Sequence, residues 1–366
     1  MPEDKNLFGF GQRDLTQKDH WRELDFSQFK FREDGATLIC FEGNGTIDST
    51  KANAGCKRNE TLMGIKIEAT DDIFSTYKDV DVLGFYYPKT EGKTVGEISQ
   101  EGFKVLTDKF MTLCTQEDGS LLPKEDIMKN FSRLVFSSHC YGAVVIDRIF
   151  SGINKNLKAQ GMSQDDVLDI FAQTAHVSYA PHTDSTLIPT VRVESFTDSV
   201  HRGLNNLYKR NYGTALDGIK IYKNSPKTLN NDYSPYVLQE NIQIFSSRLI
   251  NTEENTNLRA LKDEHEAHYL IRDEKWQSAP KFKGEPISEH AVNLDTTSQM
   301  MGYALSMFTA NAIANANSEE LIEKPSLTEI KNDLQDILDS VPTQDLKAKA
   351  PQPIETVGDD GGALPN

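Results

Sequence analysis

The chain has 366 residues, of which 37% are hydrophobic and 26% charged, a composition typical of a soluble globular protein rather than a disordered or fibrous one. A formal net charge of −16 would repel nucleic-acid phosphates and anionic lipid, so nucleic acid is not an expected partner. No apolar run approaches the roughly 20 residues of a membrane-spanning helix, and the polar start lacks a secretion signal. We therefore expect no transmembrane segment and a cytoplasmic location.

Strand-like and helix-like segments alternate along most of the chain. Short apolar runs bounded by Gly, Pro or polar residues predict strands at 37–41, 80–87, 133–137, 188–194, 218–222, 242–245 and 268–271. Apolar residues at helical spacing predict helices at about 94–115, 143–150 and 305–316, while 167–179 carries signals for both states. This alternation is typical of parallel βαβ units, so we expect an α/β fold with a mostly parallel central sheet flanked by helices.

Composition and pattern divide the chain into an extension, a domain with an insertion, and a tail. Residues 1–35 are expected to form an N-terminal extension, and 36–317 the α/β domain. A polar stretch at about 223–285, rich in Asn, Glu and Asp, is expected to be an insertion in this domain. Residues 318–366 form an acidic tail with 11 acidic and four basic side chains.

One amphipathic helix is predicted in the tail, at 326–340. Ser326 and Glu329 form a capping box, in which each side chain bonds the free backbone N–H of the other residue at a helix start. A stripe of apolar residues follows at helical spacing: Leu327, Ile330, Leu334, Ile337 and Leu338. This helix either packs on its own domain or binds a protein partner from a flexible acidic tail.

The segment 133–150 is the most informative for chemistry. The strand predicted at 133–137 turns within a few residues into the helix predicted at 143–150, and Cys140 lies at the bend. Ser138 and Gly142 supply the small side chains that a tight strand-to-helix turn requires. Unpaired N–H groups at a helix N-terminus stabilise a thiolate, so we expect Cys140 to be a reactive nucleophile.

The pentapeptide Ser138 to Gly142, Ser-His-Cys-Tyr-Gly, resembles the nucleophile elbow of the α/β-hydrolase superfamily, which reads small-x-nucleophile-x-Gly between a strand and a helix. Cys stands where most members have Ser, and Ser stands where most have Gly. A Cys nucleophile is known in dienelactone-hydrolase-like members. As an order of elements the resemblance covers roughly residues 35–305. It implies an α/β-hydrolase-like fold and a catalytic triad in the chain order nucleophile, acid, base.

Within that order, the resemblance implies Asp198 as the acid and His290 as the base. Asp198 follows the strand predicted at 188–194. His290 follows a Gly- and Pro-containing loop and precedes the helical stretch expected from about residue 298. His265 and His268 remain as rival bases.

The same resemblance implies an oxyanion hole made of backbone N–H groups. One donor would come from Tyr141, directly after the nucleophile, and the other from Gly43 or Asn44 in the glycine-containing loop after the first strand. With such a site the protein would be an acyl hydrolase or acyltransferase that forms a thioester on Cys140 from an ester, lactone, thioester or lipid. A small-molecule or lipid acyl substrate is therefore expected, and no cofactor.

Other classes of function stay open. The chain is alternatively a catalytically inactive hydrolase scaffold that binds a protein through its acidic tail, and its composition resembles that of bacterial effectors exported to a host cell by type IV secretion. His265 and His268 suggest a metal site, but the full His-Glu-x-x-His motif is missing and no metal is expected. Residues 43–48 lack the third glycine of a dinucleotide-binding loop.

Overall fold

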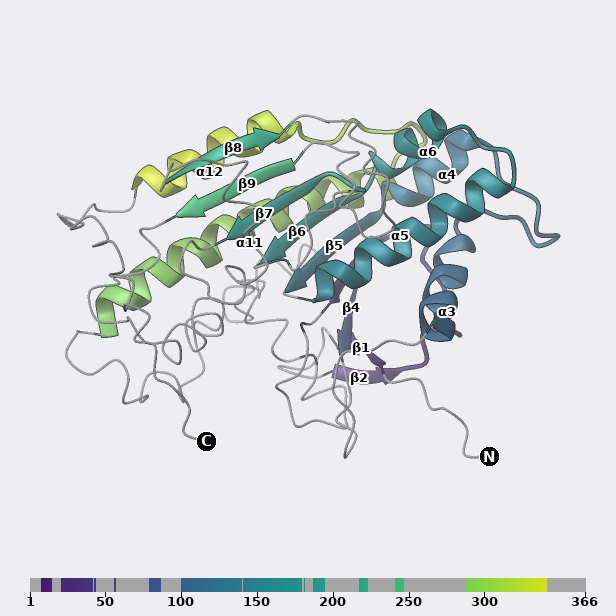
Figure 1. Ribbon diagram of the computed structural model, residues 1–366, viewed down its shortest axis with the longest axis horizontal. Helices are drawn as coiled ribbons and strands as arrows, with labels where there is room; N and C mark the ends of the chain where they lie inside the picture. Colours follow the sequence, from purple (N-terminus) through teal and green to yellow (C-terminus); the bar gives the residue numbers. More distant parts are fainter. Residues whose placement is uncertain are drawn as a thin grey trace, which may run out of the picture.

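The structure of the protein is a computed structural model, shown as a ribbon in Figure 1. It describes residues 8–14, 21–41, 43, 56, 79–86, 100–139, 141–179, 181, 187–194, 217–222, 241–246 and 287–340. The side chains of 100, 179, 193–194, 217–222, 241–246, 287–301, 335 and 337–340 lie outside this description.

Nine strands of the described residues form one sheet, in the order β2-β1-β4-β3-β5-β6-β7-β9-β8. The strands β4, β3, β5, β6, β7 and β9 run parallel to one another, whereas β1 and β2 at one edge and β8 at the other pair antiparallel. The expected α/β fold with a mostly parallel sheet is therefore confirmed. The strand bounds are β1 Gly9–Arg13, β2 Trp21–Leu24, β3 Ala36–Phe41, β4 Val80–Tyr86, β5 Leu134–His139, β6 Ala175–Tyr179, β7 Thr190–Glu194, β8 Asp217–Tyr222 and β9 Asn241–Ser246.

Two segments that the sequence set apart from the domain contribute strands to this sheet. β1 and β2 fall within 1–35, the expected extension, and β1 pairs with β4. β9 falls within 223–285, the expected insertion, and pairs parallel with β7. The strand predicted at 268–271 lies outside the described residues. The sheet is thus wider than the sequence pattern indicated at the edge formed by β1 and β2, whereas β8 and β9 match the strands predicted at 218–222 and 242–245.

Helices cover both faces of the sheet, as Figure 1 shows for α5 and α11. Side chains of a strand alternate between faces, so in β3 Leu38 and Cys40 join the core beneath α11 and α12, whereas Ile39 and Phe41 join the core beneath α3 to α6. None of the helices in the described part of the chain is long and apolar enough to cross a membrane. The helix bounds are α3 Gln100–Met111, α4 Lys124–Phe131, α5 Gly142–Ala159, α6 Gln164–Phe171, α11 Ile287–Ala316 and α12 Leu327–Ser340.

Aromatic contacts hold α5 against the sheet. Phe150 of α5 packs edge-to-face on Phe136 of β5, with ring centroids 5.3 Å apart, and on Phe171 of α6 at 4.9 Å. All three rings are fully buried. Such pairs contribute about 0.5–1.5 kcal/mol beyond the burial of their area. The direction of α5 relative to β5, and with it the bend between them, is therefore set by packing.

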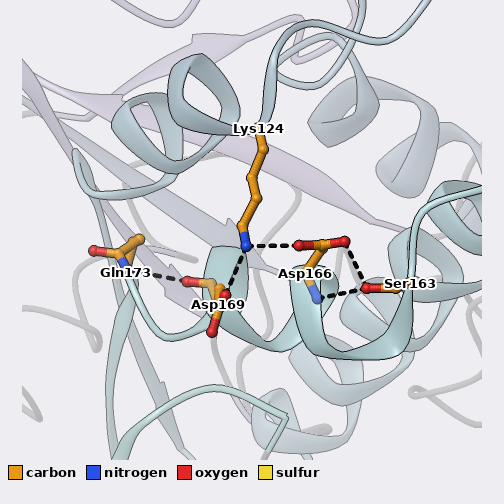
Figure 2. A network of polar contacts seen from close by, with 5 residues as sticks. All are labelled: Lys124, Ser163, Asp166, Asp169 and Gln173. Atoms are coloured by element: carbon orange, nitrogen blue, oxygen red, sulfur yellow. Dashed lines mark hydrogen bonds and ion pairs between the residues drawn. The ribbon is translucent and has the colours of Figure 1, made fainter.

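An ion-pair network joins α4 to α6 on the same side of the sheet (Figure 2). Lys124 Nζ donates to carboxylate oxygens of Asp166 at 2.6 Å and Asp169 at 2.7 Å, and both contacts raise the pKa of Lys124. The hydroxyl of Ser163 caps the start of α6 by accepting from the backbone N–H of Asp166 at 3.1 Å. These partly exposed contacts fix the relative position of two short helices.

The tail helix α12 begins at the predicted capping box. The Ser326 N–H donates to Glu329 Oε2 at 2.9 Å, and the Glu329 N–H donates to Ser326 Oγ at 3.2 Å. Three residues of the predicted apolar stripe, Leu327, Ile330 and Leu334, are buried in the core that α12 shares with α11 and the sheet. Of the two interpretations of this helix, packing on its own domain is the one observed. The rest of the tail, 341–366, lies outside the described residues.

The linker between α11 and α12 binds the opposite layer of helices. Lys324 Nζ donates to the carbonyl oxygens of Ala172 and Thr174, each at 2.8 Å, at the C-terminal end of α6. Lys129 of α4 donates to the Glu319 carbonyl at 3.1 Å. Burial lowers the pKa of Lys324 to about 7. The linker thus passes the amino end of β6 and joins the two faces of the sheet.

Candidate functional site

The bend predicted around Cys140 is described on both of its sides. β5 ends at His139, Tyr141 is the N-cap of α5, and the helix proper begins at Gly142, so the predicted order of strand, turn and helix is confirmed. Cys140 itself lies outside the described residues. The first N–H groups of a helix have no partner within it, and the first turn of α5 carries no acidic side chain. The residue before Tyr141 therefore adjoins the positive end of a helix dipole.

Gly142 shows why the start of α5 requires a glycine. A Cβ placed there would lie 2.8 Å from the carbonyl carbon of Phe41 and 3.0 Å from its Cβ, closer than carbon atoms pack. Phe41 is the last residue of β3, the neighbouring strand of β5, and Gly43 follows it as a buried residue. The N-terminus of α5 is thus pressed against the start of the loop that was expected to carry the second oxyanion donor.

Ser138, two residues before Cys140, is buried in a polar contact that the sequence did not predict. Its hydroxyl lies 2.7 Å from His176 Nε2 and 3.0 Å from Ser178 Oγ, and both partners are on the neighbouring strand β6. His176 Nδ1 lies 3.4 Å from the hydroxyl of Thr190, the first residue of β7. The only sequence signal for this cluster is that polar residues alternate with apolar ones in β6 and β7.

The bond from Thr190 to the backbone decides the donor and the acceptor of every other hydrogen bond in this cluster. Thr190 donates its one hydroxyl proton to the carbonyl of Ile188 at 2.8 Å, so it accepts from His176 Nδ1–H. Nε2 of the neutral ring then accepts from Ser138, and Ser138 accepts from Ser178. Burial, and secondarily the charge of Arg192, lower the pKa of His176 to about 3. His176 is therefore a neutral imidazole with both nitrogens engaged.

A small cavity lies beside this cluster, between α5 and the segment before β7. It offers about 20 Å³ to the centres of water-sized molecules, enough for one or two of them. Ala143 lines it and lies within about 11 Å of Cys140 along the chain. Both apolar and polar side chains line it; the lining residues are Ala143, Ile146, Asp147, Phe150, His176, Ser178, Pro181, Leu187, Ile188, Thr190 and Arg192.

The other predicted site residues are less completely described. Asp198 and Asn44 lie outside the described residues, as do the rival bases His265 and His268. The prediction that helix begins near residue 298 is wrong, because α11 begins at Ile287, directly after Pro286, and so includes His290 in its first turn.

The position of His290 along α11 determines what is required for it to act as the base. Among the α11 side chains that the structure describes, from residue 302 onward, Ala304 is the first that is buried in the core against the sheet. With a rise of about 1.5 Å per residue, His290 lies about 21 Å along the helix axis from Ala304. A base must reach its proton through hydrogen-bond contact, so this first turn has to approach Cys140 for His290 to serve. The side chain of His290 is outside the description.

The remaining cysteines differ in setting from a reactive thiol. Cys40, Cys56 and Cys114 are all free and buried. Burial raises the pKa of Cys114 to about 12, which suppresses its thiolate near neutral pH. Within the described residues, no group of three or more His, Cys, Asp or Glu side chains is placed to hold a metal ion. These three buried thiols therefore serve as internal controls for selective modification of the chain.

Comparison with known proteins adds little to this geometry. No protein-family model matches the chain, and no curated protein matches it. Among solved structures, a candidate carboxylesterase from Lactobacillus plantarum WCFS1 is similar over 56% of this chain and 84% of its own, at 12% sequence identity and a TM-score of 0.25. A TM-score this low does not establish a shared fold, so the α/β-hydrolase resemblance stays a prediction carried by the residues around Cys140.

Proposed function

We propose that the protein is an acyl hydrolase or acyltransferase of the α/β-hydrolase type, with Cys140 as its nucleophile. The observation that carries the proposal is the bend from β5 to α5, closed by the contact between Gly142 and Phe41. A thiol between that strand and that helix start is next to free backbone N–H groups, which favour the thiolate. The Cys140 thiolate is therefore the attacking species.

The proposed reaction has two acyl-transfer steps. Cys140 Sγ attacks the acyl carbon of an ester or thioester, the bond from that carbon to the alcohol or thiol breaks, and a thioester remains on Cys140. The N–H groups of Tyr141 and of Gly43 or Asn44 stabilise the oxyanion in each step. His290, oriented by Asp198, protonates the leaving group and then takes a proton from water or another acceptor that attacks the thioester.

The cavity next to Ala143 supports a small acyl group. With room for one or two water-sized molecules, it suits a group of one or two heavy atoms beyond the acyl carbon, such as acetyl, better than a long fatty acyl chain. The apolar side chains in its lining, such as Ile146 and Leu187, favour the methyl end of such a group over water. Short-chain esters and thioesters are therefore the substrate class that we propose.

Alkylation of Cys140 tests the nucleophile directly. Native protein at pH 6 is treated with limiting iodoacetamide, and the modified peptides are quantified by mass spectrometry against unfolded protein. We expect Cys140 to be labelled at least about tenfold faster than in the unfolded chain, because the helix terminus favours its thiolate. Cys114, which is buried, is the internal control. Equal labelling of Cys140 in native and unfolded protein would reject the nucleophile and favour a non-catalytic binding scaffold.

Turnover of p-nitrophenyl esters tests the reaction and its acyl specificity. Acetate should be hydrolysed faster than octanoate, and Cys140→Ala should abolish hydrolysis of both, whereas Cys114→Ala should retain it if folded. His290→Ala, His265→Ala and His268→Ala then identify the base, as the variant that loses turnover while Cys140 is still alkylated. If none of the three loses turnover, the triad as proposed is refuted.

A further inference from the structure

The bend that carries Cys140 is anchored on both sides by contacts to neighbouring strands. After Cys140, Gly142 is pressed against the backbone of Phe41 in β3. Before it, the Ser138 side chain is bonded to His176 and Ser178 in β6. β3 and β6 flank β5 on opposite sides. The bend is therefore held from both directions in the plane of the sheet.

The contacts before Cys140 form a hydrogen-bond chain in which every hydroxyl or ring N–H proton is donated to a partner. It runs from Ser178 through Ser138, His176 and Thr190 and ends on the backbone carbonyl of Ile188. All four side chains are buried, with exposed fractions of 5% or less. A fully paired buried chain favours one arrangement, because breaking any of its bonds costs the pairing of a buried polar group. The position of the Ser138 hydroxyl is thereby fixed.

We propose that His176 is a positioning residue, which acts through Ser138 to hold the turn between β5 and α5, the segment of the chain to which Cys140 belongs. This inference rests on the proposed function, since it concerns the same nucleophile. Ser138 fills a position where a turn of this kind needs only a small residue, yet its hydroxyl makes two buried bonds. The hydroxyl and its imidazole partner supply a constraint that glycine would lack.

The constraint matters because the stabilisation of a thiolate by a helix terminus depends on close approach. The effect decays within the first turn, so a small displacement of the Cys140 backbone weakens it. If the pKa of the Cys140 thiol rises by about one unit, the fraction of thiolate at a pH below that pKa falls about tenfold. We therefore expect loss of the anchor to slow alkylation at pH 6 by about tenfold and to raise the pH midpoint by about one unit.

The experiment measures the rate of Cys140 alkylation against pH in matched variants of the full chain. Ser138→Ala removes the hydroxyl and keeps the small side chain. His176→Gln keeps an acceptor for Ser138 and a donor for Thr190, so it is the conservative rescue variant. Ser137→Ala is the control, because Ser137 is equally buried on the opposite face of β5. Thermal unfolding followed by circular dichroism confirms that each variant folds.

Ser138→Ala should lower the alkylation rate at pH 6 and raise its midpoint, whereas His176→Gln and Ser137→Ala should stay within about twofold of the wild type. If Ser138→Ala does not fold, Ser178→Ala, which removes one bond of the chain, is measured instead with an expected effect in the same direction. A reactive Cys140 in the wild type that is unchanged by these variants refutes the positioning role alone. A wild-type Cys140 without enhanced reactivity refutes the proposed function instead.

Discussion

Gly142→Ala tests the contact that closes the bend. The added methyl would lie 2.8 Å from the Phe41 carbonyl carbon and 3.0 Å from its Cβ, whereas carbon atoms pack at about 3.5–4.0 Å. The methyl would lie even closer to the Phe41 carbonyl oxygen, so the start of α5 must retreat from β3 by about 1 Å. Forcing a methyl into a packed site costs about 1–3 kcal/mol, and Ala regains at most about 1 kcal/mol over Gly in a helix. We expect a net loss of about 1–2 kcal/mol in the free energy of unfolding.

Gly152→Ala is the matched control, because it adds the same methyl to the same helix. There the methyl would meet the side chain of Thr107, at 2.7 Å from Oγ1 and 2.9 Å from Cγ2, and a side chain can rotate away whereas the Phe41 backbone cannot. Urea unfolding followed by circular dichroism should therefore show Gly142→Ala to be the less stable variant. Cys140 alkylation should also slow in Gly142→Ala alone, since small misplacements weaken catalytic geometry. Equal stability and equal alkylation of the two variants would refute the close approach of α5 to β3.

Three further substitutions test contacts of the helical layers. Burial lowers the pKa of Lys324 to about 7, so between pH 7 and pH 10 the unfolded chain binds more protons than the folded protein. The free energy of unfolding therefore gains a contribution as the pH rises from 7 toward 10. Thermal unfolding of Lys324→Met should lack this increase. Lys124→Met should lower the free energy of unfolding in urea by no more than about 1 kcal/mol, because the contacts of Lys124 with Asp166 and Asp169 are partly exposed. The loss should be smaller at high salt, which screens these charges, and a larger loss at high salt would contradict this reasoning. Ser326→Ala should cost about 1 kcal/mol in the same assay, and no loss would show that the cap contributes nothing to α12.

The parts of the fold that the sequence predicted well are those in which burial is complete. Every residue of β3 and β5 is buried, and except for His139 at the end of β5 each strand reads as a run of apolar or small residues. β1 and β2 were not predicted, because they form an edge hairpin whose partner, β4, lies about 70 residues later in the chain. α4 was also missed, since an eight-residue helix with few apolar residues gives little periodic signal.

The candidate site was predictable only where local backbone geometry determines residue type. Gly142 was identified correctly as a residue that a tight turn requires, and the structure supplies the neighbouring backbone that excludes a side chain there. The cluster of Ser138, His176 and Thr190 was not predictable, because its hydrogen bonds join three strands and depend on register. The start of α11 was misplaced because 287–297 mixes polar and apolar residues without a clear helical stripe.

The packing of α11 has a consequence for synthesis of the chain on the ribosome. Strands made early, including β3 and β4, direct apolar side chains such as Leu38 and Val82 into a layer that is completed by Leu305, Phe308 and Ile330. Until those last residues emerge, one side of the nascent sheet lacks the apolar cover that α11 and α12 give it and is exposed to non-native association. A ribosome that stalls after residue 286 would therefore present an aggregation-prone intermediate in which one face of the sheet is exposed. Synthesis of the last quarter of the chain then completes the core and stabilises the protein.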